Sequence, residues 1–185
     1  MRTLEFGPLP EKDWTTIGVA KQKDGQRRLL TALTALAPTP PWPPYDSYLA
    51  LIQNLDKKYK QMMESEVRYE AYQIDDAELI LVAYGYTARV SKEAVKICRK
   101  QGLKVGLIRP ITVWPFPSQV IAEKAKEGSK FLVVEDSLGQ MVDDVELAVR
   151  GQAEVHLLGM LARHAPSDAG MILPERVIEE IKKLI

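Results

Sequence analysis

Three turns of the chain place glycine, hydroxyl, aromatic and charged residues directly after apolar runs that are typical of buried strands. In open α/β sheets, ligands and partners meet the carboxyl ends of the strands, near the point where the strand order reverses. These turns are therefore the first place to search for chemistry. They are Tyr84-Gly85-Tyr86-Thr87, Arg109 to Pro117, and Glu135 to Gln140.

Common catalytic and phosphate-binding motifs are missing from these turns. Gly85 does not belong to a GxGxxG dinucleotide turn, and the chain has no GxxxxGK[ST] phosphate loop. Ser137 lacks the GxSxG elbow of a hydrolase nucleophile. Glu135 and Asp136 could serve acid–base catalysis, but neighbours in an extended chain point to opposite faces. Capping of the following helix is the favoured interpretation of this acidic pair.

Histidine and cysteine offer no metal or nucleophile site. His156 lies in a predicted strand and His164 in an irregular segment, without HExxH or CxxC spacing. Cys98 lies on the apolar face of a predicted helix, where a thiol is buried and inert. One cysteine can form neither an internal disulfide nor a cluster site, so we expect a reducing cytoplasm. We expect no catalytic, cofactor-binding or metal-ligating residue in this chain.

From residue 67 onward, apolar strands alternate with amphipathic helices, and these elements position the three turns. Continuous apolar runs are typical of strands that are buried on both faces of a parallel sheet. The connections are long enough for crossover helices, which favours right-handed βαβ units. The predicted fold is α/β, a three-layer sandwich. The runs are Leu79–Tyr84, Leu103–Ile108, Phe131–Val134 and, more weakly, Ala153–Leu158, and a terminal helix begins at Pro174.

Three parts are expected along the chain. Residues 1–45 form an irregular Pro/Gly-rich linker, residues 46–66 an amphipathic helix, and residues 67–185 the α/β domain. The run Ala37–Pro44 predicts polyproline II, as a linker, a strap or a ligand of a proline-recognition domain. The apolar stripe of the helix must pack against its own domain or a partner, and formation of a homodimer would cover it. The stripe comprises Tyr48, Ile52, Leu55, Tyr59 and Met62.

The charge balance limits the classes of partner. Lys+Arg 25 against Asp+Glu 25 gives a formal net charge of +0, so no global field attracts nucleic acid or an anionic membrane. The first residues lack the apolar core of a signal peptide, and no apolar run approaches the ~18 residues of a membrane span. We therefore expect a soluble cytoplasmic protein whose partners are neither nucleic acid nor membrane.

Several motifs together resemble one family, the carboxy-terminal domain of the alpha subunit of 2-oxoacid:ferredoxin oxidoreductases, most closely the 2-oxoisovalerate type. The likeness covers roughly residues 67–151. It implies a transketolase carboxy-terminal-like fold with a mixed, mostly parallel five-stranded sheet. In that sheet the strand Val67–Ile74 is antiparallel beside the strand ending at Arg109, and the strand ending at Tyr84 is central. The motifs are Arg68-Tyr69-Glu70-Ala71-Tyr72, Asp76 to Gly85, Val105 to Pro110, Trp114-Pro115-Phe116-Pro117, Val133-Val134-Glu135 and Gly139 to Val145.

The resemblance also implies an activity for the whole complex. Enzymes of this family decarboxylate a 2-oxoacid on thiamine diphosphate with magnesium, pass electrons through iron–sulfur clusters to ferredoxin, and transfer the acyl group to coenzyme A. This chain is too short for the thiamine-binding domain, so we expect a structural or assembly piece that binds none of these cofactors alone. Other subunits would be its partners, and ferredoxin only an indirect one. The alternatives are a free-standing dimerisation or binding module, or the matching piece of a lipoamide-linked 2-oxoacid dehydrogenase.

Without catalytic groups, the turns are expected to form a subunit interface. Trp114 and Phe116 should face a partner on a proline-stiffened loop, unless both rings enter the domain's own core. Arg109 and Glu135 should pair across Gly85; alternatively, Glu135 caps the helix beginning near Gly139 while Arg109 reaches solvent or a partner. The interface and switch-point candidates are Gly85, Thr87, Arg109, Trp114, Phe116, Glu135 and Gly139.

Overall fold

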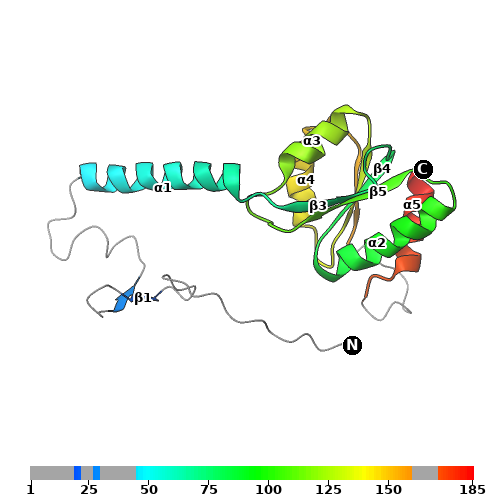
Figure 1. Cartoon of the computed structure of the whole chain (residues 1–185), viewed down its shortest axis with the longest axis horizontal. Helices are drawn as coiled ribbons and strands as arrows, with labels where there is room; N and C mark the ends of the chain where they lie inside the picture. Colours follow the sequence, from blue (N-terminus) through cyan, green and yellow to red (C-terminus); the bar gives the residue numbers. More distant parts are fainter. Residues whose placement is uncertain (1–18, 22–26, 30–44, 160–170) are drawn as a thin grey trace. The chain divides into compact units, whose positions relative to one another are not determined.

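The computed structural model describes residues 19–21, 27–29, 45–159 and 171–185 (Figure 1). The chain divides into two units, Met1–Tyr59 and Lys60–Ile185. In the first unit, strands β1 (Val19–Lys21) and β2 (Arg27–Leu29) form an antiparallel pair. Residues 1–45 were expected to be irregular, so this short pair was not predicted. A strand of three residues is too short to show the alternating pattern by which strands are recognised in a sequence. The proline run lies outside the described residues.

Helix α1 (Tyr45–Ser65) occupies the stretch whose apolar spacing predicts a helix. Among the stripe residues, Ile52 and Tyr59 are exposed, and Leu55 and Met62 are half-buried. The side chain of Tyr48 lies outside the described residues. Burial of this stripe against protein therefore stays a prediction.

The second unit is built on a mixed sheet of five strands in the order β3-β5-β4-β6-β7. Strand β3 runs antiparallel to β5, and the other neighbours are parallel. This confirms the predicted sheet, with β4 central and β3 at one edge, although β3 is shorter than Val67–Ile74. The strands are β3 (Tyr69–Tyr72), β4 (Leu79–Ala83), β5 (Val105–Pro110), β6 (Lys130–Val134) and β7 (Val155–Leu158).

Helices cover both faces of the sheet, which gives the predicted three layers (Figure 1). Helices α2 (Gly85–Lys100) and α5 (Pro174–Leu184) pack on one face. Helices α3 (Ser118–Lys126) and α4 (Met141–Val149) pack on the other. Within the described ranges, no helix combines the length and the apolar character that a bilayer span requires.

Strand β4 divides its side chains between two cores. Leu79 and Leu81 pack toward α2 and α5, whereas Ile80 and Val82 pack toward α3 and α4. All four side chains are fully buried. Since successive side chains of a strand point to opposite faces, only an unbroken apolar run can fill both cores.

Gly106 of β5 is required by a close approach of another backbone segment. A Cβ at this position would lie 2.6 Å from the carbonyl oxygen of Gln73 and 3.0 Å from the Cα of Ile74. Any side chain would therefore push the β3–β4 connection away from the sheet.

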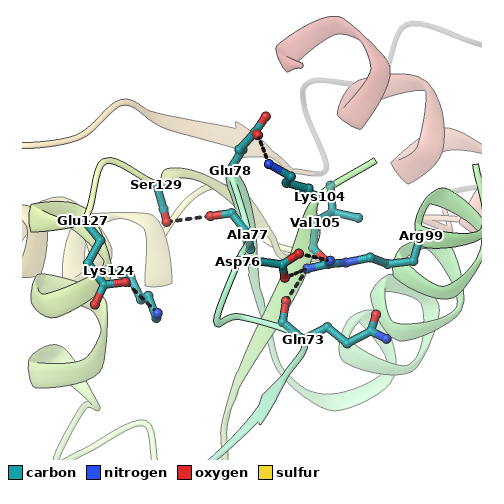
Figure 2. A network of polar contacts seen from close by, with 10 residues as sticks. All are labelled: Gln73, Asp76, Ala77, Glu78, Arg99, Lys104, Val105, Lys124, Glu127 and Ser129. Atoms are coloured by element: carbon teal, nitrogen blue, oxygen red, sulfur yellow. Dashed lines mark hydrogen bonds and ion pairs between the residues drawn. The ribbon is translucent and has the colours of Figure 1, made fainter. Parts of the chain in front are cut away.

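Arg99, in the last turn of α2, ties that connection to the amino end of the sheet (Figure 2). Its Nε donates to the carbonyl of Val105 at 2.6 Å, and its Nη2 donates to the carbonyl of Gln73 at 2.6 Å. Its Nη1 donates to Asp76 Oδ2 at 2.9 Å, and this guanidinium holds the pKa of Asp76 below its ordinary value. One side chain thus joins three segments. Nearby, Ser129 Oγ donates to the buried carbonyl of Ala77 at 2.8 Å.

Replacing Arg99 by Met should destabilise the α/β unit by about 2 kcal/mol, because two carbonyls lose a charged donor. For a chain of this size that corresponds to a fall in melting temperature of about 4–8 °C. Lys100→Met is the matched control, because it removes a cation from the same helical turn at an exposed position. Thermal unfolding followed by circular dichroism measures both variants, and equal melting temperatures would contradict this role.

Candidate functional site

The carboxyl ends of β4 to β7 lie along one edge of the sheet, since these strands are parallel. All of the interface candidates lie at this edge. Gly85 and Thr87 begin α2, Arg109 lies near the end of β5, and Glu135 directly follows β6. Trp114 and Phe116 lie in the β5–α3 loop, and Gly139 lies just before α4.

The carboxylate of Glu135 is fully buried and caps the amino end of α4. Its Oε1 accepts from the backbone N–H of Gln140 and of Val142, both at 3.1 Å. Its Oε2 accepts from the N–H of Met141 at 2.9 Å and from Ser137 Oγ at 3.0 Å. The first amides of a helix have no partner within the helix, and a negative charge suits that end. Glu135 is therefore a structural cap rather than a free base.

The expected pair between Arg109 and Glu135 is wrong. Of the alternative, the part in which Glu135 caps the helix is confirmed, whereas Arg109 pairs within its own chain. Arg109 Nη1 instead lies 3.1 Å from Glu70 Oε2. Glu70 stands directly opposite Arg109 in the β3–β5 ladder. Directly opposite residues such as Arg109 and Glu70 have Cβ atoms about 5 Å apart. A pair between Arg109 and Glu135 would have to reach across β4, over two strand spacings or about 10 Å. Both side chains of the observed pair are about half exposed.

The β4–α2 turn is held by short polar contacts. Thr87 is buried, and its Oγ1 donates to the carbonyl of Tyr84 at 2.8 Å. Gly85 has φ +60, in the left-handed region. Tyr86 donates to Asp136 Oδ2 at 2.6 Å, which links this turn to the β6–α4 loop. Sequence reasoning missed that link; the available signal was that both residues follow adjacent parallel strands.

Gly139 is required by the β6–α4 loop. Its φ is +102, and a Cβ would lie 3.1 Å from Leu157 Cδ2. Its N–H donates to Ser137 Oγ at 3.2 Å. This loop therefore presents the α4 amides to Glu135 in a fixed arrangement.

The β5–α3 loop separates the two aromatic rings that were expected to act together. Phe116 is half-buried and packs against the core under α3 and α4, and Pro115 and Pro117 are buried. Trp114 is 53% exposed. Neither predicted alternative holds for the whole loop: Trp114 faces outward and Phe116 faces inward.

Exposed apolar side chains gather at this edge. Of the 15 large exposed hydrophobic residues found in the described ranges, seven belong to the strand ends and the three turns of this edge. Such residues commonly mark interfaces when they are contiguous rather than scattered. They are Tyr69, Tyr84, Tyr86, Ile111, Val113, Trp114 and Leu138.

The described acidic side chains of this edge do not gather into a metal site. Among the residues that the structure describes, no three His, Cys, Asp or Glu side chains gather as metal ligands. Burial raises the pKa of Asp144 in α4, and the charges of Asp143 and Glu135 raise it further. The first amides of α4 already bind the Glu135 carboxylate, and magnesium would need free oxygen ligands.

Residues 77–170 match the family model described as pyruvate:ferredoxin oxidoreductase core domain II. The match covers just over half of the chain. The chain belongs to this family. The matched stretch contains the central strand of the sheet and all three turns of the carboxyl edge.

One curated relative is similar to this chain in sequence, and two solved structures share its fold. The ketoisovalerate oxidoreductase subunit VorB of Methanothermobacter marburgensis is 50% identical over 107 residues, which are 58% of this chain and 30% of VorB. The chain thus spans about a third of that relative's length. The 2-oxoglutarate:ferredoxin oxidoreductase of Magnetococcus marinus, solved with 2-oxoglutarate, coenzyme A and succinyl-CoA, aligns at TM-score 0.61 and 16% identity, over 96% of this chain and 33% of its own.

The second structure is a split gene transketolase, described as an inactive beta4 tetramer. It aligns at TM-score 0.53 and 16% identity, over 63% of this chain and 40% of its own. Together the two structures confirm the predicted transketolase carboxy-terminal-like fold.

Replacing Glu135 by Gln should cost about 2–3 kcal/mol, because an amide N–H₂ would face backbone N–H groups that now meet a carboxylate. Chemical denaturation of the full chain measures this loss. Glu146→Gln serves as the control, since it neutralises an exposed carboxylate on the same helix. If both variants unfold at the same denaturant concentration, Glu135 does not stabilise α4.

Proposed function

We propose that this chain is part of the alpha subunit of a 2-oxoacid:ferredoxin oxidoreductase of the 2-oxoisovalerate type. The observation that supports this most strongly is the 50% identity to VorB over 107 residues. In the complex, the α/β unit would act as an assembly domain rather than as the source of catalytic groups.

The polar groups of the carboxyl edge favour assembly over catalysis. Glu135 is occupied by helix amides, Asp136 accepts from Tyr86, and Arg109 pairs with Glu70. None of these groups projects into an open site as an activated base or nucleophile would. Apolar side chains supply the exposed surface of the edge instead.

The cofactors of the reaction would belong to the rest of the complex. Thiamine diphosphate and magnesium would supply decarboxylation, iron–sulfur clusters electron transfer, and coenzyme A the acyl acceptor. Ferredoxin would meet the clusters rather than this domain. We further propose a cytoplasmic location, residues 67–185 as the folded assembly unit, and a homodimer of the chain as one arrangement that would cover α1.

Purification of the tagged full chain from its source cell tests this proposal. Subunits of a 2-oxoacid:ferredoxin oxidoreductase should co-purify, and the preparation should reduce a viologen dye when given coenzyme A and a 2-oxoacid. Pyruvate, 2-oxoglutarate and 2-oxoisovalerate are compared in parallel, with the last expected to be fastest. Recovery of the chain alone as a homodimer would favour a free-standing dimerisation module. Lipoamide-linked partners without iron–sulfur subunits would favour a 2-oxoacid dehydrogenase.

The isolated full chain should bind neither thiamine diphosphate nor magnesium tightly, because the described residues offer no cluster of oxygen ligands. Isothermal calorimetry with both ligands present should give no saturable heat in the micromolar range. The co-purified complex is the positive control. Saturation of the isolated chain at one equivalent would contradict the expectation.

A further inference from the structure

We infer that four apolar residues at one corner of the carboxyl edge form the docking surface for the remainder of the oxidoreductase alpha subunit. We call them the β5–α3 corner. They are Tyr69, Ile111, Val113 and Trp114. This inference rests on the proposed function and names the partner of its interface.

The exposure of the corner is substantial in the described unit. Ile111 is 51% exposed, Val113 58%, Trp114 53% and Tyr69 41%. Tyr69 stands opposite Pro110 in the β3–β5 ladder, so it adjoins the start of the loop. The four residues therefore occupy neighbouring backbone positions at the end of the β3–β5 ladder and in the loop that follows it. Large aromatic and aliphatic side chains that gather in this way are typical of interface anchors.

The backbone of the corner is held in place although its side chains point outward. The N–H groups of Ile111 and Thr112 both donate to the carbonyl of Arg68, at 2.9 and 3.1 Å. Thr112 Oγ1 accepts from the N–H of Arg68 at 3.0 Å and lies 3.0 Å from the carbonyl of Pro115, to which it donates.

The far end of the loop is anchored as well. Pro115 and Pro117 are buried, and Phe116 packs against the core. The loop is thus fixed at both ends, and a partner would not need to order it on binding. Such preorganisation lowers the entropic cost of association.

The charges beside the corner are paired within the chain. Arg68 lies 3.3 Å from Glu66, and Arg109 lies 3.1 Å from Glu70. Each of these two cations therefore has its own anion, and the two pairs add no net charge that would draw nucleic acid or a strongly acidic protein. The matching partner is an uncharged, apolar protein face, as in the centre of subunit interfaces.

The length of the relative supports the choice of one partner. The alignment covers 30% of VorB, so most of that subunit lies outside the domain that this chain supplies. The remainder of the alpha subunit is therefore the occupant that we assign to the β5–α3 corner.

The test changes the corner in the full chain and measures which subunits are captured from the source cell. The double variant Ile111→Asp/Val113→Asp places two charges in the centre of the surface. It should reduce capture of the alpha-subunit remainder by at least about tenfold, as expected for loss of interface anchors. Leu147→Asp is the control, because Leu147 is 74% exposed on α4 and should leave capture unchanged.

Thermal unfolding of each variant accompanies the capture. Exposed substitutions are expected to change stability little. If the Asp variant does melt lower, Ile111→Ser/Val113→Ser replaces it, since this pair removes apolar area without adding charge, and a weaker loss of capture is then expected.

The outcomes separate this inference from the proposed function. Equal capture by wild type and a folded double variant overturns the docking surface and leaves the oxidoreductase assignment intact. Failure of the wild type to capture any oxidoreductase subunit overturns both. A wild-type homodimer that the double variant converts to monomer identifies a second copy as the occupant, which also overturns the inference.

Discussion

Burial of β4 on both faces is the constraint on which the arrangement of the α/β unit depends. A strand whose five residues are all buried needs hydrogen-bonded neighbours on each side and helices above and below. Strands β5 and β6 are the hydrogen-bonded neighbours, and the helix pairs α2/α5 and α3/α4 cover the two faces. Because crossover connections are right-handed, these requirements leave few topologies, and the carboxyl ends of the parallel strands then share one edge.

At that edge, the structure uses its polar groups internally. Glu135 stabilises the start of α4, Tyr86 links two loops through Asp136, and Thr87 closes its own turn. A catalytic edge would instead keep some of these groups free toward a substrate. The apolar residues that remain exposed agree with the proposed role of this unit as an assembly domain.

Sequence reasoning identified the elements whose periodicity is long and regular. The apolar runs of β4, β5 and β6 are unambiguous, and the strand order followed from the resemblance to a family. The side-chain contacts within these elements were harder to predict. Arg109 was assigned to Glu135 because both residues lie at the carboxyl edge of the sheet. The register between β3 and β5 instead places Glu70 directly opposite Arg109. Trp114 and Phe116 are both apolar in the sequence, and their spacing does not indicate which ring turns inward. In the structure, Phe116 packs against the core between two buried prolines. The β1–β2 pair is too short to leave a pattern.

The division of β4 between two cores has a consequence for how this domain can diverge. Leu79 and Leu81 belong to one core, and Ile80 and Val82 belong to the other, with the sheet backbone between them. Substitutions in separate cores share few contacts, so their effects on stability should be close to additive. The α2/α5 layer could therefore be repacked to suit a new neighbour while the layer beneath the β5–α3 loop keeps its shape. The residues on one face of the sheet can therefore be substituted without repacking the core on the other face.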